Sequence, residues 1–230
     1  VYELGSVFKT FTVAAGLEEG LIKTDTQFLN LEKRLKCGKN IISEYDKKIP
    51  SDLTVEQILI RSGNIGSVRI GQKLEIEKLK LFLEKIGILS KIDFDIDEVG
   101  EPIPFRWGKC KLATVSFGHG ITTTLLQLAK GYAIITNGGF EIKPSLIKKD
   151  LEDNQNQKRI IKKGVSKQIN KILRKIVTTK EGTAEFANIK GYEVGGKTGT
   201  AEKAIVGGYT KKAKVNTFVS IFPTSKPKYV

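Results

Sequence analysis

Apolar residues recur at helical spacing along much of this chain. Leu79, Leu83 and Ile86 are spaced four and three positions apart, which predicts an amphipathic helix over residues 76–86 with Gly87 as its C-terminal stop. Similar spacing predicts further helices, over residues 10–17, 51–60, 65–74, 125–135 and 165–177.

Two of these helices also show boundary signals. Ser51 or Asp52 is placed to cap the helix over residues 51–60. The helix over residues 125–135 should end at the Asn-Gly-Gly breaker of residues 137–139.

Strand patterns are concentrated near the end of the chain. Branched and aromatic residues predict a strand over residues 215–222, and an alternating segment at residues 192–194 leads into residues 196–200. Residues 20–37, 93–111 and 150–158 read as loop or irregular segments. Helices mixed with a few late strands, without a repeat or a dividing linker, predict one α+β domain over residues 1–230.

The composition fits a folded domain with a basic surface. At 40% hydrophobic and 28% charged residues, the 230-residue chain can bury a core. No apolar run reaches the roughly 18 residues that span a bilayer. The net charge of +14 fits nucleic acid, anionic lipid or an anionic polymer, but the lysines are scattered and no nucleic-acid-binding motif is present, so nucleic acid is not expected.

Cysteine and histidine are too sparse for a metal site. Cys37 and Cys110 lie far apart, and His119 is the only histidine, so the spacing of a zinc site is missing. We expect neither metal nor cofactor. The spacing leaves a disulfide open, and His119, between two glycines, is expected to be a loop residue making hydrogen bonds.

A serine and a lysine near the start of the chain form a candidate nucleophile and base. Ser6 and Lys9 would lie one turn apart on a helix face, and a desolvated lysine can take the proton of a serine hydroxyl. Serine is also a common helix cap, and lysine is usually solvated, so this pair alone does not identify an enzyme.

Two later stretches give the pair a chemical context. In Ser62-Gly63-Asn64, Ser62 is suited to pass a proton to a departing amine and Asn64 to hold a substrate backbone. In the Lys-Thr-Gly-Thr run of residues 197–200, Lys197, Thr198 and Thr200 are suited to bind a substrate carboxylate. The backbone N–H groups of Ser6 and Thr200 are candidates for an oxyanion hole.

The second run also matches a phosphate-binding loop. Residues 191–198 fit the pattern Gly-x4-Gly-Lys-Thr. Such a loop lies between a strand and a helix, and the sequence after Thr198 is a poor helix, so the nucleotide interpretation is disfavoured.

Together these motifs resemble the transpeptidase domain of class B penicillin-binding proteins, most closely the division-specific septal transpeptidase. The resemblance covers nearly all 230 residues and extends to Arg106-Trp107, Ser116-Phe117-Gly118-His119-Gly120 and Asn137-Gly138-Gly139. It implies a mainly antiparallel sheet packed between helices, with the active site at the sheet edge. It also implies catalytic roles for Ser6, Lys9 and Ser62, and substrate-binding roles for Asn64, Lys197, Thr198, Gly199 and Thr200.

The resemblance further implies a function, partners and a location. The reaction is the cross-linking of peptidoglycan stem peptides through an acyl-serine, and penicillins acylate the same serine. Cell-division and glycan-polymerising membrane proteins are expected partners, with the catalytic domain in the periplasm and an anchor in the bacterial inner membrane. We expect this chain to be a fragment that lacks the anchor, the strands before the nucleophile helix, and a final strand and helix.

Three related functions use the same motifs and stay open at this point. They are a D,D-carboxypeptidase, a serine β-lactamase and a β-lactam sensor that is acylated without turnover. A β-lactamase must also activate water, for which Glu98 or Glu101 is a candidate, although both lie in a segment that reads as an irregular loop.

Overall fold

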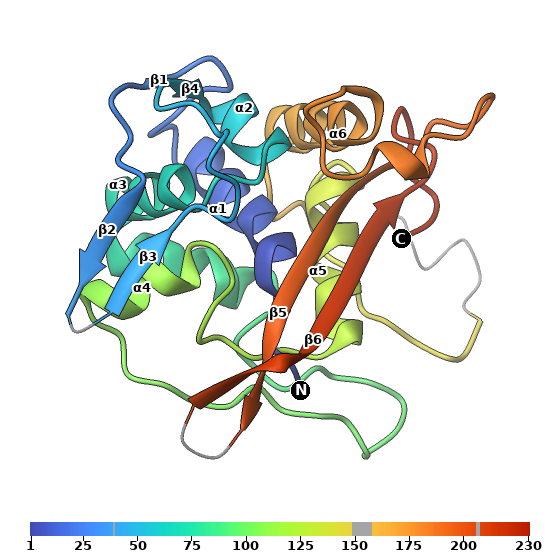
Figure 1. The fold of residues 1–230 in the computed structure, drawn as a ribbon. Coiled ribbons are helices and arrows are strands. Elements are labelled where there is room, and N and C mark those ends of the chain that lie inside the picture. The colour runs from blue at the N-terminus through green and yellow to red at the C-terminus, as the bar shows by residue number, and fades with distance from the viewer. Residues whose placement is uncertain (39, 149–157, 206–207) are drawn as a thin grey trace.

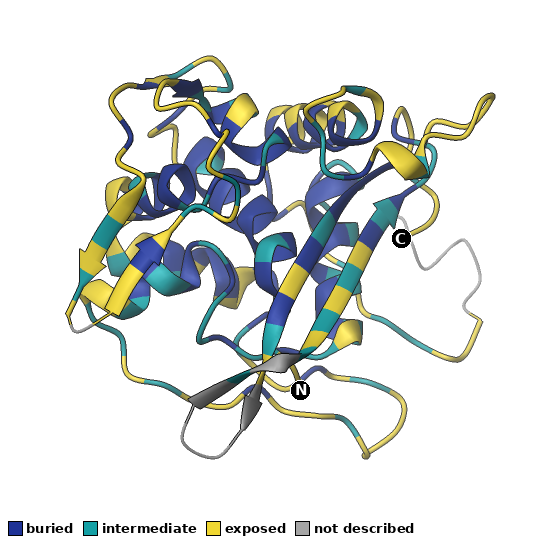
Figure 2. Ribbon diagram, viewed as in Figure 1, coloured by how far each residue is buried: buried dark blue, intermediate teal, exposed yellow. Residues whose placement is uncertain are grey.

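Helix α1 (Lys9–Glu18) runs through the middle of the molecule (Figure 1). In the computed structural model, which describes residues 1–38, 40–148, 158–205 and 208–230, every α1 residue from Lys9 to Leu17 is buried (Figure 2). A helix that is buried on all sides belongs to the core of its domain. The other helices are η1 (Gly5–Phe8), α2 (Val55–Ile60), α3 (Asn64–Lys85), α4 (Lys109–Val115), α5 (Leu125–Thr136), α6 (Lys163–Thr178) and η3 (Glu185–Ala187).

The helices match the predicted segments closely. Helices α2, α3 and α6 all contact α1, α4 packs on α3, and α5 packs on α6. The separate predictions over residues 65–74 and 76–86 correspond to the two halves of α3, which meet at a kink where Glu75 has a φ of 61°. The exposed side of α6 carries basic residues, among them Lys163, Lys167 and Lys171.

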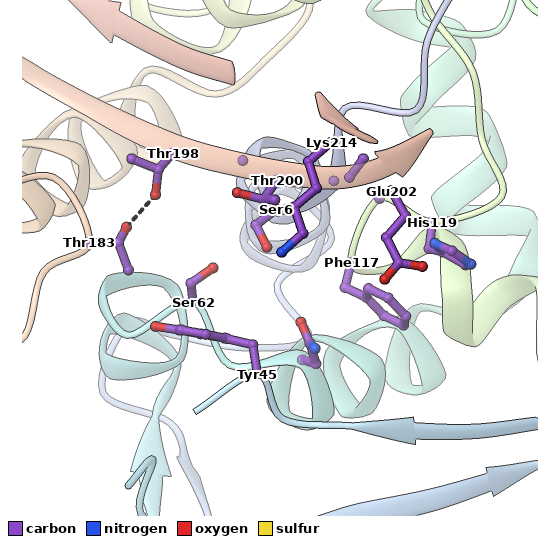
Figure 3. Close-up of a pocket in the computed structure, with 15 residues that line it drawn as sticks. Ser6, Tyr45, Ser62, Phe117, His119, Thr183, Thr198, Thr200, Glu202 and Lys214 are labelled. Carbon is purple, nitrogen blue, oxygen red and sulfur yellow. Dashed lines mark hydrogen bonds between the residues drawn. The ribbon is translucent and has the colours of Figure 1, made fainter. Parts of the chain in front are cut away.

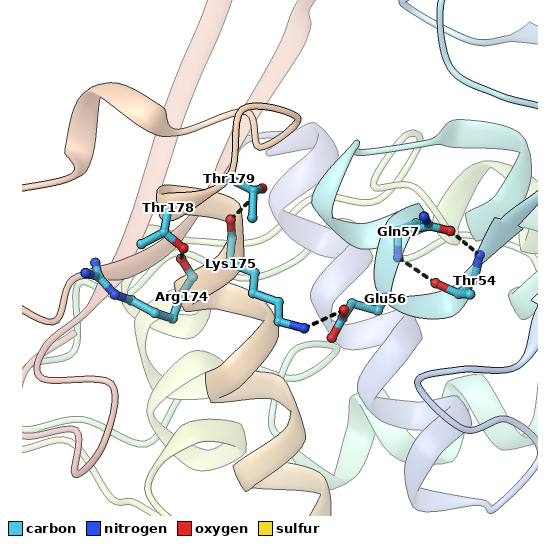
Figure 4. Close-up of polar contacts among 7 residues, drawn as sticks. All are labelled: Thr54, Glu56, Gln57, Arg174, Lys175, Thr178 and Thr179. Carbon is cyan, nitrogen blue, oxygen red and sulfur yellow. Dashed lines mark hydrogen bonds and ion pairs between the residues drawn. The ribbon is translucent and has the colours of Figure 1, made fainter.

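Helix α2 begins with a capping box, and its N-cap residue lies two or three positions after the residues predicted to cap it. The Gln57 backbone N–H donates to Thr54 Oγ1 (3.2 Å), and the Thr54 N–H donates to Gln57 Oε1 (2.9 Å; Figure 4). The expectation that Ser51 or Asp52 caps this helix was therefore wrong. Asp52 instead accepts a hydrogen bond from the Asn30 backbone N–H (2.7 Å), which fixes the preceding loop.

All strand pairs among the described residues are antiparallel. β1 (Gln27–Phe28) pairs with β4 (Leu53–Thr54), β2 (Arg34–Cys37) with β3 (Asn40–Ser43), and β5 (Gly195–Ile205) with β6 (Gly208–Ile221). The β5–β6 hairpin is the longest, and its strand β5 lies against η1 and α6. The α+β prediction is confirmed, and the predicted strand over residues 215–222 lies within β6 except for its last residue.

Two elements were missed because long-range contacts hold them. The β2–β3 hairpin was not anticipated, and residues 109–115 of α4 fell within or just after the segment predicted as irregular. The disulfide that the sequence left open joins them, since Cys37 of β2 is bonded to Cys110 of α4. Most of the polar segment over residues 150–158 lies outside the described residues. Among those described, no helix is both long and apolar enough to cross a bilayer.

Candidate active site

A cavity of about 670 Å³ opens between η1, the turn after α2 and strand β5 (Figure 3). Ser6 lies on its wall, together with Ser62 and Asn64. Strand β5 supplies Thr198, Gly199 and Thr200 to the same wall. The structure therefore brings the three motifs into one site, although they are separated by more than 50 residues in the sequence.

Lys9 lies fully buried beneath this cavity. Its Nζ donates to the backbone oxygen of Ser62 (2.5 Å), to Ser62 Oγ (3.2 Å) and to Asn64 Oδ1 (2.6 Å). Burial lowers the pKa of Lys9 from 10.5 to about 7, while the charge of the Glu44 carboxylate acts in the opposite direction. Near neutral pH Lys9 therefore exchanges between the ammonium form, which has enough protons for all three hydrogen bonds, and the neutral amine, which can accept a proton.

A second buried lysine reaches the same serine from strand β5. Lys197 Nζ donates to Ser62 Oγ (2.9 Å) and to the carbonyl oxygen of Thr198 (2.9 Å). Burial lowers the pKa of Lys197 well below its usual value, and the charge of Lys9 lowers it further. Since both lysines donate to Ser62 Oγ, its two acceptor positions are occupied and its own proton is left to point elsewhere.

The backbone conformation of Ser62 is fixed by hydrogen bonds at the end of α2. The Gly63 N–H donates to the Ile58 oxygen (2.9 Å) and the Ser62 N–H to the Leu59 oxygen (3.2 Å), a Schellman motif at the end of α2. Ser62 has the left-handed φ of 57° that this motif normally assigns to glycine. A serine kept in a conformation that costs it on the order of 1 kcal/mol indicates that its side chain is needed.

Ser6 is presented by a tighter turn than predicted. It lies in the 3₁₀ helix η1, and Lys9 is the first residue of α1. Ser6 and Lys9 are therefore still about one turn apart, and the hydrogen bonds of the Lys9 amine go to Ser62 and Asn64. The N-cap of α1 is Phe8, and no side chain makes a capping hydrogen bond there. Ser6 therefore does not cap this helix, which was the purely structural alternative for a serine at this position.

Strand β5 and η1 approach each other at backbone distance. A Cβ placed on Gly5 would lie 2.4 Å from the Thr200 carbonyl oxygen, and one on Gly199 would lie 2.4 Å from the Leu4 carbonyl oxygen. Only glycine permits such contact, and Gly5 also has a φ of 60°. This approach brings the backbone of β5 against the turn that carries Ser6.

The remaining β5 residues divide between the cavity and the interior. Thr198 Oγ1 donates to Thr183 Oγ1 (2.7 Å), and Thr200 Oγ1 donates to Asn216 Oδ1 (3.1 Å). Both threonines line the cavity, as the sequence led us to expect. Lys197 is completely buried and meets Ser62 instead of lining the cavity wall.

Several cavity residues carried no signal in the sequence. The wall also contains Tyr45, Thr183, Glu202 and Lys214. They come from separate loops and strands and belong to no local motif, so only the fold brings them together. His119 lines the cavity as well, with Nδ1 3.4 Å from the Glu3 carboxylate, in keeping with the loop role expected for it.

Two alternatives raised by the sequence lose their basis in this geometry. Residues 195–205 form one continuous strand, so no helix follows the Gly-Lys-Thr run as a phosphate loop requires. Glu98 and Glu101, the two candidates for activating water, do not line the cavity, whereas Glu202, which the sequence did not suggest for this role, does.

A cavity lined by Ser6 and Ser62, with the buried amine of Lys9 bonded to Ser62, contains the kinds of group that acyl transfer through a serine uses. The family model for the penicillin binding protein transpeptidase domain matches residues 1–230. The chain belongs to this family, and the resemblance drawn from the sequence motifs is confirmed.

Relatives and solved structures agree with this assignment. The chain is 31% identical over 232 residues to a probable peptidoglycan D,D-transpeptidase FtsI of Caulobacter vibrioides, covering 99% of this chain and 39% of that protein. It is 32% identical over 250 residues to stage V sporulation protein D of Bacillus subtilis, covering 100% of this chain and 37% of that protein. A solved transpeptidase domain of Burkholderia pseudomallei penicillin-binding protein 3 superposes with a TM-score of 0.90 at 26% identity, covering 99% of this chain and 69% of the other. The chain thus spans about two fifths of the length of these two relatives.

Proposed function

We propose that this chain provides the catalytic domain of a peptidoglycan D,D-transpeptidase that works through an acyl-serine. One observation carries the proposal: Ser62 Oγ is held between the buried amines of Lys9 and Lys197, on the wall of the cavity that Ser6 also lines. Relatives of this chain are named as probable peptidoglycan D,D-transpeptidases, which supports the substrate class.

The first step joins the acyl group to Ser6. Neutral Lys9 takes the Ser6 proton, and the Ser6 oxygen attacks the carbonyl carbon of the terminal peptide bond of a stem peptide. Ser62 then gives its proton to the departing amine nitrogen as the C–N bond breaks, and Lys9 returns a proton to Ser62. The products are an ester on Ser6 and a free D-amino acid.

The second step transfers the acyl group to another stem peptide. Its amine attacks the ester carbonyl, loses a proton to the Ser62–Lys9 pair, and the Ser6 oxygen leaves with a proton. Backbone N–H groups of Ser6 and Thr200 are suited to hold the negative oxygen in both steps. Asn64 and Gly199 contact the substrate backbone in this scheme.

Recognition of the substrate carboxylate falls to the threonines of β5. Thr198 and Thr200 line the cavity, and their hydroxyl protons would turn from Thr183 and Asn216 to the carboxylate when a substrate binds. Lys197 reaches this wall only from behind: its buried amine donates to Ser62 Oγ and to the Thr198 carbonyl oxygen, so it supports the wall and does not itself line the cavity. A ligand whose carboxylate is replaced by an amide should therefore bind more weakly.

The same chemistry predicts covalent labelling by penicillins. Solved structures of Mycobacterium penicillin-binding protein 3 include complexes with aztreonam and ampicillin, which supports β-lactams as ligands of this fold. We further propose a septal role, with cell-division and glycan-polymerising membrane proteins as partners. The catalytic domain would lie in the periplasm, anchored to the bacterial inner membrane.

The test is intact-mass analysis after incubation with ampicillin, followed by peptide mapping. We expect one adduct on Ser6, none in Ser6→Ala, and normal labelling in Ser51→Ala, which changes an exposed serine. An adduct on any other residue would refute the assignment of Ser6.

The lifetime of the adduct separates a transpeptidase from a β-lactamase. Because no carboxylate of the Glu98–Glu101 segment lines the cavity, the adduct should persist after free drug is removed. Decay within seconds would indicate a β-lactamase. Transfer of a stem-peptide acyl group to an added D-amino acid separates the transpeptidase from a sensor, which would show none.

A further inference from the structure

The turn that carries Ser62 and Asn64 is held by a carboxylate from another part of the chain. Glu44 directly follows strand β3, and its Oε2 accepts a hydrogen bond from the Asn64 backbone N–H (2.7 Å). Its Oε1 accepts one from the Ile65 N–H (2.9 Å). These are the first two residues of α3, whose N-cap, Gly63, has no side chain to offer and whose first turn contains no acid.

The residue before Glu44 adds a third hydrogen bond to the first two residues of α3. The Ser43 carbonyl oxygen accepts a hydrogen bond from Asn64 Nδ2 (2.8 Å). With both its backbone N–H and its amide nitrogen fixed by residues 43 and 44, Asn64 can turn only its Oδ1 toward Lys9, which donates to it at 2.6 Å. A continuous set of hydrogen bonds therefore runs from Glu44 through Asn64 to the Lys9 amine.

The hairpin that bears Glu44 is itself anchored to α3. Strand β3 contacts α3 directly, and its partner β2 is bonded through Cys37 to Cys110 of α4, which packs on α3. The carboxylate is thus supplied by an element fixed to the helix that it caps. Asn64 and Lys9 were visible in the sequence motifs, whereas Glu44 belongs to none of them.

Glu44 also supplies negative charge near the buried amine of Lys9. Its carboxylate opposes the effect of burial on the pKa of Lys9, while Lys197 faces Lys9 from strand β5 with the same sign of charge. The pKa of Tyr45, the next residue, is raised by burial and by the nearby Asp46 and Glu44 carboxylates. The charge of Arg61 acts in the opposite direction.

Resting on the acyl-transfer function proposed above, we propose that Glu44 is a positioning residue for that reaction. By capping α3, it holds the turn between α2 and α3 so that Ser62 and Asn64 present their oxygens to the Lys9 amine. It does not touch substrate in this role.

The test compares Glu44→Gln with Glu44→Asp in the full chain, using a fluorescent penicillin and stopped-flow kinetics. Glutamine keeps the size but loses the charge and sets an amide N–H₂ against one of the two backbone donors. We expect the limiting acylation rate to fall about ten- to a hundredfold, because small misplacements of catalytic groups are costly. Non-covalent binding of the penicillin should change less than twofold.

The pH profile gives a readout that a purely structural role would not move. Loss of the carboxylate removes the influence that raises the pKa of Lys9, so the rise of rate with pH should shift to lower pH in Glu44→Gln. Glu44→Asp keeps the charge on a shorter side chain, so its rate should fall while the rise stays at the wild-type pH. Glu56→Gln is the matched control, since Glu56 lies in the first turn of α2 and pairs with Lys175 (2.7 Å; Figure 4). Its rate should stay within twofold of wild type.

The outcomes are distinct for each part of the reasoning. The inference is wrong if Glu44→Gln has the wild-type pH profile and, after correction for the fraction of active protein, the wild-type limiting rate. If Glu44→Gln does not fold, Glu44→Asp decides: a wild-type rate overturns the inference, and a reduced rate with an unmoved pH profile supports it. A wild-type chain that fails to label at Ser6 overturns the proposed function and this inference together, whereas normal wild-type labelling leaves the function standing.

Discussion

The pH dependence of acylation follows directly from the burial of Lys9. With a pKa of about 7, Lys9 is about 9% neutral at pH 6, about half neutral at pH 7 and about 91% neutral at pH 8. If the neutral amine takes the Ser6 proton, the limiting acylation rate should rise about tenfold between pH 6 and pH 8 and then level off.

The magnitude attributable to burial can be worked from the same values. A lysine that kept its ordinary pKa of 10.5 would be only about 0.03% neutral at pH 7, so burial raises the neutral share by a factor of about 1,500. Lys9→Arg places a group that does not lose its proton at the same position. It should lower the rate on the order of a thousandfold and abolish the rise with pH.

Stopped-flow measurement of a fluorescent penicillin at saturating concentration, from pH 5.5 to 9.5, isolates the acylation step from binding. Lys171→Arg, at an exposed position of α6, is the control for general effects of replacing lysine and should retain the wild-type profile. A flat wild-type profile, or a rise centred near pH 10 in a folded protein, would refute the role of Lys9 as the base.

Two further predictions concern the fold around the site. The pKa of Lys9 is lower in the folded chain than in the unfolded chain, so the unfolded chain binds more protons between pH 7 and 10.5 and stability rises with pH across that window. Between pH 7 and pH 9 the wild type should gain about 2 kcal/mol relative to Lys9→Met in urea unfolding, and parallel pH curves would contradict this. Gly5→Ala would drive a Cβ to 2.4 Å from a backbone oxygen of β5, and acylation should fall about a hundredfold. Gly20→Ala, with a similar φ of 68° but no atom within 4 Å, should acylate normally, and equal rates for the two variants would refute the close-approach argument.

Much of the site was predictable because most of its candidate residues belong to short local sequence motifs. Ser6 and Lys9 are three residues apart, and Ser62 and Asn64 are two apart, so a turn or helix start fixes each pair before any long-range contact forms. The predicted helices were located for the same reason, since their apolar spacing is a local property.

What the sequence could not supply depends on contacts between distant segments. The direction of the Lys197 side chain is set by the register of β5 beside η1, and its amine turned inward to Ser62 instead of outward to the cavity. Glu44 and Thr183 reach the site from loops with no motif of their own. The β2–β3 hairpin and α4 are too short for a periodic pattern and are stabilised by packing and by their disulfide.

The placement of two lysines in the core reveals a conflict between stability and activity within this fold. A charged lysine resists burial, and two facing amines resist it more, so each favours the neutral form that proton transfer requires. The unfavourable free energy of burying Lys9 is offset by the packing of α1, whose residues from Lys9 to Leu17 are all buried. A lysine on an exposed helix would keep its proton at neutral pH and could not serve as the base. The central position of α1 therefore matters for the proposed chemistry: the same packing that stabilises the domain lowers the pKa of the Lys9 amine that contacts Ser62.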